Sequence, residues 1–157
     1  GADEIDVVLP YKLLLNGERQ AVTEFLEGCR HQISGKCLKV ILETGSYTST
    51  EQITEAALLA IDCGADFIKT STGKIPVGAT PEAASAMLTA IQQRPNQTVG
   101  IKLSGGIRDL HTAALYYQIA KDTMGPKWIQ ANTFRLGTSG LLDTILKALE
   151  TSPTTDK

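Results

Sequence analysis

The sequence predicts an α/β fold in which helices cover a parallel β-sheet. Five short strand-like segments recur along the 157-residue chain, and an apolar stripe with helical spacing follows each one. Strict alternation of these patterns is typical of a parallel sheet, because the chain crosses back through a helix after every strand. An open doubly wound sheet and part of a (β/α)8 barrel both fit the pattern. Five units are too few to close such a barrel, which typically takes ~250 residues.

The predicted strands are short segments, mostly rich in β-branched residues, with glycine or polar turns at their ends. No Gly-x-Gly-x-x-Gly segment follows any of them, so nothing supports a dinucleotide-binding sheet. The strands cover Asp3–Leu9, Leu38–Thr44, Phe67–Ser71, Thr98–Ser104 and Thr133–Gly137.

The predicted helices carry apolar stripes and recognisable end signals. Ser49 and Gln52 have the spacing of a capping box, and Gly64 ends that helix. Thr80–Pro81 opens the next helix, since proline is tolerated in a first turn, and Asp109 caps the helix after it. The stripes consist of Ala21, Val22, Phe25, Leu26 and Cys29; Ile53, Ala56, Ala57, Ala60 and Ile61; Ala84, Met87, Leu88 and Ile91; Ala113, Ala114 and Tyr117; and Leu141, Leu142, Ile145, Leu146 and Leu149.

The bulk composition limits the classes of partner. A net charge of −2 gives no indication of nucleic acid or an anionic membrane, and no apolar run approaches the ~20 residues of a membrane span. Cys29, Cys37 and Cys63 are odd in number and lack metal-site spacing. We therefore expect free thiols, no metal site and a cytoplasmic location.

We expect one domain over residues 1–150, followed by a polar, disordered tail over residues 151–157. The chain opens without a methionine, and its first strand-like segment already begins at Asp3. Buried parallel strands seldom open a domain with nothing before them. The chain is therefore expected to be a fragment of a longer one.

Lys69 lies in the middle of the strand-like segment Phe67–Ser71. Parallel strands are poorly hydrated, so an ammonium group there needs a partner or a chemical role. A desolvated lysine loses its proton more easily, and its neutral amine can attack a carbonyl to form a Schiff base. The turn that follows, Thr72-Gly73-Lys74, offers backbone N–H groups and a second lysine that suit a phosphate. The alternative is a lysine held in a structural salt bridge.

Every predicted strand contains a charged residue. Successive strand residues point to opposite sides of a sheet, so the position of each charged residue decides which face it lies on. These side chains are Asp6, Lys39, Lys69, Lys102 and Arg135. If the faces converge, two close lysines disfavour each other's protonation, and Asp6 can hold the remaining cation or relay protons through water. An ion-pair network that only lines a barrel is the alternative.

Two glycine-rich turns follow the fourth and fifth predicted strands. They are Ser104–Arg108, which leads into the helix capped by Asp109, and Gly137–Gly140, which leads into the last helix. Each presents backbone N–H groups beside a helix N-terminus, a common way of holding phosphate in α/β barrels. With Thr72–Lys74 they predict a phosphate site, and a Schiff-base lysine beside it predicts chemistry on a phosphorylated sugar or aldehyde.

Five segments of the chain resemble deoxyribose-phosphate aldolases. Members of that family are class I aldolases on a (β/α)8 barrel that need neither metal nor organic cofactor. They reversibly cleave 2-deoxy-D-ribose 5-phosphate into acetaldehyde and D-glyceraldehyde 3-phosphate. The resemblance thus implies a TIM-barrel family fold, here an incomplete barrel of five parallel βα units, with small phosphorylated sugar and aldehyde substrates. The segments are Gly1–Val8, Lys39–Gly45, Gly64–Lys74, Gly100–Arg108 and Phe134–Ser139.

The resemblance also implies roles for individual residues. Lys69 corresponds to the Schiff-base lysine, Lys102 to the neighbour that lowers its pKa, and Asp6 to the proton-relay carboxylate. Lys39 corresponds to a supporting interior lysine. The positions similar to phosphate-contacting ones are Thr72, Gly73, Lys74, Gly105, Gly106, Gly137 and Ser139, with Arg108 close by.

The chain departs from the family's pattern in four places. About the first three βα units and the terminal tyrosine of some members are absent. Ile101–Ser104 replaces the commoner Phe-Lys-Pro-Ala, and Gly140 stands where many members have a second serine. An incomplete barrel has two exposed sheet edges, so we expect poor activity, aggregation or association into a homo-oligomer.

Three other functions stay open. Another Schiff-base, phosphate-binding barrel enzyme, such as a transaldolase-like protein, would also be trapped by borohydride. A sugar-phosphate isomerase would use a carboxylate or cysteine base and form no imine. An inactive truncated barrel or phosphosugar-binding fragment would bind ligand without turning it over.

Overall fold

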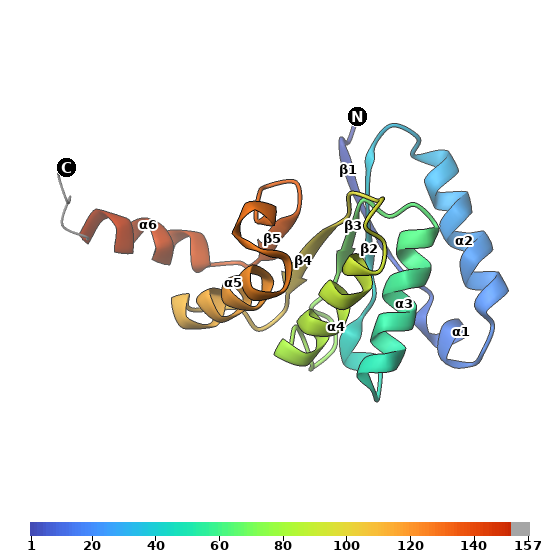
Figure 1. The fold of residues 1–157 in the computed structure, drawn as a ribbon, viewed down its shortest axis with the longest axis horizontal. Coiled ribbons are helices and arrows are strands. Elements are labelled where there is room, and N and C mark those ends of the chain that lie inside the picture. Colours follow the sequence, from blue (N-terminus) through green and yellow to red (C-terminus); the bar gives the residue numbers. More distant parts are fainter. Residues whose placement is uncertain (152–157) are drawn as a thin grey trace.

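The computed structural model describes residues 1–151, in which strands and helices alternate (Figure 1). The prediction of alternating strands and helices is therefore confirmed. The elements are β1 (Glu4–Val8), α1 (Tyr11–Leu15), α2 (Arg19–Gln32), β2 (Cys37–Ile41), the short 3-10 helix η1 (Thr44–Ser46), α3 (Thr50–Asp62), β3 (Phe67–Lys69), α4 (Pro81–Gln92), β4 (Gly100–Ser104), α5 (Leu110–Met124), the short 3-10 helix η2 (Pro126–Trp128), β5 (Phe134–Gly137) and α6 (Leu141–Thr151).

The five strands form one parallel sheet in the order β1-β2-β3-β4-β5, so each strand pairs only with its neighbours in sequence. In a flat sheet β1 and β5 would lie about 19 Å apart, four spacings of about 4.8 Å. The Glu4 carboxylate on β1 nevertheless lies 2.6 Å from the Arg135 guanidinium on β5. The sheet must therefore curve strongly, as part of a barrel wall does. This geometry excludes the open doubly wound sheet.

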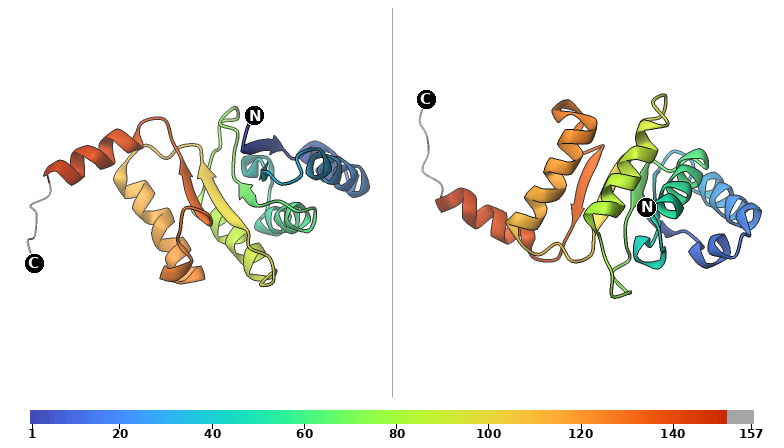
Figure 2. Two further views of the ribbon diagram at one scale, coloured as in Figure 1. Left: turned by 90° about the horizontal axis from the view of Figure 1, so that it is seen from above. Right: turned by 60° about the horizontal axis from the view of Figure 1, so that its bottom comes forward.

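Helices α2 to α5 lie along the convex side of this curved sheet and leave its concave side uncovered (Figure 2). The apolar core fills the layer between them, since the strand residues that point outward are completely buried. This separation leaves the concave face for polar side chains. The buried strand residues are Leu38, Val40, Ile68, Ile101 and Leu103, and their helix partners in the core include Ala57, Ala60, Ala84, Met87 and Leu88.

Three of the predicted helix starts are confirmed by side-chain caps. Ser49 accepts a hydrogen bond from the backbone N–H of Gln52, and Thr80 and Asp109 each accept one from the residue three positions on. The return bond of the predicted capping box is different, because the Gln52 side chain accepts from Thr48 instead. Gly64 follows α3 with φ +87°, a conformation that favours glycine.

The burial predicted for part of the helical stripes is wrong. Phe25 and Tyr117 are more than 40% exposed, and the α6 residues Leu142, Leu146 and Leu149 are 48–67% exposed. Helix α6 extends away from the rest of the molecule (Figure 1), so its apolar face meets little of the described chain. The strands predicted to reach Thr44 and Ser71 also end earlier, at Ile41 and Lys69. Apart from Thr151, the predicted tail lies outside the described residues.

The three cysteines are free, as predicted. Within residues 1–151, no helix has both the length and the apolar character needed to cross a membrane.

We expect the chain to associate with further copies of itself, because β1 and β5 have unpaired backbone groups along their outer edges. Val8 is 40% exposed on β1. Val8→Lys places a charge on this edge and should weaken association about tenfold, measured by sedimentation velocity over a concentration series. Leu115→Lys, at an equally exposed position on α5, adds the same charge away from both edges. A wild-type chain that stays monomeric, or equal effects of both substitutions, would contradict the prediction.

Candidate active site

The concave face gathers three lysines around a single carboxylate. Lys39 donates a hydrogen bond to Asp6 Oδ1 at 2.8 Å, and Lys69 and Lys102 donate to Oδ2 at 2.8 and 3.1 Å. The four residues come from β1, β2, β3 and β4. Residue parity thus placed the correct side chains on one face, and the curvature of the sheet brings their ends into contact.

The strand register explains how these side chains meet. Asp6 lies beside Lys39 in the pairing of β1 with β2. Lys69 lies beside Lys102, and Lys102 beside Arg135, in the next layer of the concave face. Lys69 and Lys102 are therefore neighbours on adjacent strands, and the Asp6 carboxylate accepts a hydrogen bond from each of them.

Asp6 and Lys39 hold each other in their charged forms. Partial burial opposes ionisation of Asp6, but hydrogen bonds from the three lysines outweigh it, so its pKa lies well below the usual value. Burial likewise opposes protonation of Lys39, which is 4% exposed. Its hydrogen bonds to Asp6 and Glu4 prevail and raise the pKa of Lys39. Asp6 is therefore an ionised acceptor and Lys39 a fixed cation at neutral pH.

Glu4 and Arg135 form a second polar contact, which joins the two edge strands β1 and β5 across the concave face. A hydrogen bond from Arg135, followed by one from Lys39, lowers the pKa of Glu4 to about 2. The Arg135 guanidinium also lies 4.4 Å from the centre of the Phe67 ring. Gly100 makes room for that ring, since a Cβ at position 100 would lie 2.3 Å from it.

The three turns predicted to hold phosphate are linked to one another. Gly78, in the loop after β3, touches the backbone of Gly105 so closely that a Cβ at position 78 would lie 2.5 Å from it. The N–H of Ala79 donates to the carbonyls of Ser104 and Gly105. Thr138 Oγ1, in the loop after β5, donates to the carbonyl of Ile107 at 2.9 Å. The turns at the carboxyl ends of β3, β4 and β5 therefore form one connected surface.

The predicted phosphate residues differ in how available they are. Gly73, Lys74, Gly106, Arg108 and Ser139 are exposed on this surface. Within residues 1–151, Lys74 and Arg108 form no ion pair, so both cations are available to bind an anion.

Gly105, Gly137 and Thr72 are partly buried, and each has a structural contact. Gly105 touches Gly78, and a Cβ at Gly137 would lie 3.4 Å from Lys102 Cε. Thr72 has a contact of its own, because both its N–H and its hydroxyl donate to Glu43.

Sequence reasoning missed Glu43 as part of this site. It follows β2 and is 2% exposed, and its carboxylate binds the turn after β3. Strand parity could not show this, because β2 has already ended at Ile41. The signal available was an acidic residue among the apolar residues of a predicted buried strand.

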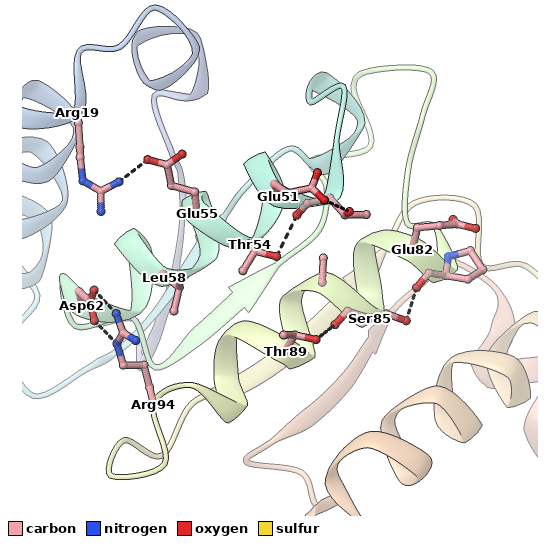
Figure 3. A pocket seen from close by; sticks show the side chains of 13 residues that line it. Arg19, Glu51, Thr54, Glu55, Leu58, Asp62, Glu82, Ser85, Thr89 and Arg94 are labelled. Carbon is pink, nitrogen blue, oxygen red and sulfur yellow. Dashed lines mark hydrogen bonds and ion pairs between the residues drawn. The ribbon is translucent and has the colours of Figure 1, made fainter.

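A groove of about 820 Å³ lies elsewhere, on the outer surface between α3 and α4 (Figure 3). Its two arginines are already paired, Arg19 with Glu55 at 2.8 Å and Arg94 with Asp62 at 2.6 Å, and the acidic residues Glu51 and Glu82 also line it. None of the concave-face lysines lines it. We assign no catalytic role to this groove.

Among residues 1–151, no three His, Cys, Asp or Glu side chains are grouped so as to hold a metal ion. We therefore name no metal ligands.

A curved parallel sheet with helices outside and charged side chains inside defines an incomplete α/β barrel of the TIM type. A family model described as DeoC/LacD family aldolase matches residues 1–141. The chain belongs to this family of aldolases.

Solved structures of aldolases share the fold. The apo form of a protein assigned as a deoxyribose-phosphate aldolase from Toxoplasma gondii has a TM-score of 0.88 and 25% identity, and the match covers 99% of this chain and 62% of that one. QR15, an aldolase, has a TM-score of 0.74 and 30% identity, covering 97% and 63%. A deoxyribose phosphate aldolase from Aeropyrum pernix, described as having a unique tetrameric structure, has a TM-score of 0.70 and 25% identity, covering 96% and 56%. The chain therefore spans less than two thirds of the length of each.

The stability that Asp6 provides should depend on pH. Because its pKa is depressed in the folded chain, this contribution is complete above the unfolded value near 3.8 and is lost as the pH falls toward the folded value. We expect Asp6→Asn to lower the free energy of unfolding by about 2 kcal/mol at neutral pH, and the difference from wild type to shrink below pH ~4.

Urea denaturation at stepped pH measures this difference. Asp122→Asn is the matched control, since Asp122 on α5 is exposed and accepts a hydrogen bond from Gln118, far from the concave face. A difference between Asp6→Asn and wild type that stays constant down to acid pH would contradict the prediction.

Proposed function

We propose that this chain carries the catalytic lysine of a class I aldolase, which reversibly cleaves 2-deoxy-D-ribose 5-phosphate to acetaldehyde and D-glyceraldehyde 3-phosphate. The observation that supports this most is the contact of Lys69 and Lys102 with the same oxygen of Asp6. Such a cluster combines an amine that can form an imine with an ionised carboxylate that orients the amine by a hydrogen bond. Membership of an aldolase family supports the same reaction class.

The proposed reaction begins at the Lys69 amine. Its neutral form attacks the C1 aldehyde carbon of the open-chain sugar, and loss of water gives a protonated imine. The C3 hydroxyl then gives up its proton, the C2–C3 bond breaks, and its electron pair moves toward the imine. This step leaves an enamine on Lys69 and releases glyceraldehyde 3-phosphate. Protonation of the enamine at C2 and hydrolysis of the imine release acetaldehyde and return the amine.

Asp6 and Lys102 are the candidate partners for proton movement. The Asp6 carboxylate stays ionised at neutral pH, so it can accept a hydrogen bond from the amine or from a water that exchanges protons with it. Lys102 donates to the same oxygen of Asp6 as Lys69 does, and its Nζ lies 3.1 Å from that oxygen.

The exposed turns supply the proposed site for the phosphate. This surface offers backbone N–H groups at Gly73 and Gly106 and the hydroxyl of Ser139 at the carboxyl edge of the sheet. It also carries the cations of Lys74 and Arg108, which form no ion pair within residues 1–151. Helices α5 and α6 begin nearby, and helix N-termini favour anions. A sugar bound in this way would present its aldehyde end to the concave face.

The concave face is open in this chain, and this bears on activity. Asp6 retains 28% of its side-chain exposure, so water reaches the cluster and weakens the electrostatic effects within it. The related structures are longer, and one is described as tetrameric. We propose that full activity needs the missing wall of the barrel, supplied by further chain or by association with another copy.

Trapping of the imine tests this function. We expect incubation with acetaldehyde and borohydride to add one reduced two-carbon group to the chain, detected by intact mass, and Lys69→Ala to abolish the adduct. Lys121→Ala, which removes an exposed lysine on α5, is the matched control and should retain the adduct. A folded chain that forms no adduct would favour a phosphosugar-binding fragment, and an imine-free isomerase would give the same result but interconvert sugar phosphates.

The phosphate part of the proposal has a separate test. Lys74→Ala removes one charge-assisted contact, so KM for deoxyribose 5-phosphate should rise about 10- to 100-fold, equivalent to roughly 1.5–3 kcal/mol. Trapping of acetaldehyde, which has no phosphate, should change much less. Loss of both reactions to the same extent would show that Lys74 supports the fold of the site and does not bind the phosphate.

A further inference from the structure

Glu43 has an unusual backbone conformation for a side chain of its size. Its φ is +58°, and among residues 1–151 it is the only residue other than glycine with a positive φ. Such a conformation costs free energy and persists only where the surrounding contacts impose it. It is also 2% exposed, although a buried carboxylate is costly unless hydrogen bonds satisfy it. Strain and burial coincide at one residue.

The carboxylate of Glu43 binds the turn that carries Lys74. Its Oε1 accepts the backbone N–H of Thr72 at 3.1 Å, and its Oε2 accepts the Thr72 hydroxyl at 2.5 Å. The same hydroxyl oxygen accepts the backbone N–H of Lys74 at 3.0 Å. A continuous chain of hydrogen bonds therefore runs from Glu43 through Thr72 to the backbone of Lys74.

The backbone on either side of Glu43 is attached to the strand that carries Lys69. The N–H of Leu42 donates to the carbonyl of Lys69, and the N–H of Thr44 donates to the carbonyl of Thr70, both at 2.8 Å. The strained residue thus lies between two anchors, so its carboxylate has a defined position relative to Lys69. Both the proposed imine lysine and the turn after it are located by this one segment of chain.

The backbone N–H of Lys74 fixes the direction of the hydrogen bonds, because an N–H can only donate. The Thr72 hydroxyl oxygen accepts that bond, and the hydroxyl in turn donates to Glu43 Oε2. The Glu43 carboxylate is therefore the acceptor at the end of the chain of bonds. An amide in the same place offers an NH₂ group, which would compete to donate to the hydroxyl and remove this direction.

We propose that Glu43 is a positioning residue that holds the Thr72–Lys74 turn in the conformation needed to bind the phosphate. Thr72 is then a link and not a phosphate ligand, because both of its donors are used by Glu43. The groups left to meet the anion are the N–H of Gly73 and the side chain of Lys74. This inference rests on the proposed function, in that it concerns the phosphate half of the same site.

Glu43→Gln tests the proposal, with inorganic phosphate and deoxyribose 5-phosphate as probes. The apparent Kd for inorganic phosphate, measured by NMR titration of the backbone amides, should rise about tenfold, and KM for deoxyribose 5-phosphate should rise with it. The yield of the borohydride-reduced acetaldehyde adduct should fall far less, because this probe has no phosphate. Glu24→Gln, the same change at an exposed residue of α2, is the matched control.

Thr72→Val provides an independent variant that removes the hydroxyl link. It should raise the phosphate Kd by a similar factor, and the double variant with Glu43→Gln should be no worse than either alone, because both break the same chain of bonds. If Glu43→Gln does not fold, Thr72→Val decides alone. Unchanged phosphate affinity in the variants, additive effects, or equal losses with phosphate and acetaldehyde would overturn the proposal.

The outcomes for the two proposals are separable. If the wild-type chain traps no acetaldehyde but binds phosphate in a manner that depends on Glu43, the aldolase reaction is wrong and the positioning role stands. If the wild-type chain traps acetaldehyde but binds no phosphate, the positioning role is overturned and the imine chemistry stands.

Discussion

One carboxylate organises the interior of this molecule. Asp6 accepts hydrogen bonds from Lys39, Lys69 and Lys102, which reach it from three different strands. In a flat sheet β1 and β4 would be about 14 Å apart, three strand spacings, so this contact exists only because the sheet curves. Helices α2 to α5 lie on the convex side of this curved sheet, which puts the apolar core there and the charges on the other face.

The charged face and the turns above it have different structural origins, and the sequence predicts the first better than the second. Alternation along a strand decides which side chains share a face, and this rule needs no knowledge of neighbours. It correctly grouped Asp6, Lys39, Lys69 and Lys102, whose contacts span up to 96 positions. The rule stops where a strand stops. Glu43 lies past the end of β2 in a left-handed conformation, and nothing local in the sequence reveals that its carboxylate reaches Thr72.

Burial of the helices was harder to predict for a related reason. An apolar stripe shows that a helix face can be buried but not whether another part of the molecule covers it. The stripes of α3 and α4 pack on the sheet and on each other, so the prediction holds for them. The leucines of α6 have the same spacing and remain exposed. The difference lies in the position of the helix beside the last strand, which has a partner on one side only.

The strand order also determines the order in which the molecule can assemble. Every backbone pairing joins neighbours in sequence, so folding can proceed unit by unit with only short loops to close at each step. The contacts of Asp6 with Lys102 and of Glu4 with Arg135 span 96 and 131 positions and require four or five strands to be in place. The charged cluster therefore exists only when β1 and β4 are both in place. Detachment of β1 alone would take Asp6 away from all three lysines while the other four strands stayed paired, so local opening at one edge is enough to dismantle the cluster.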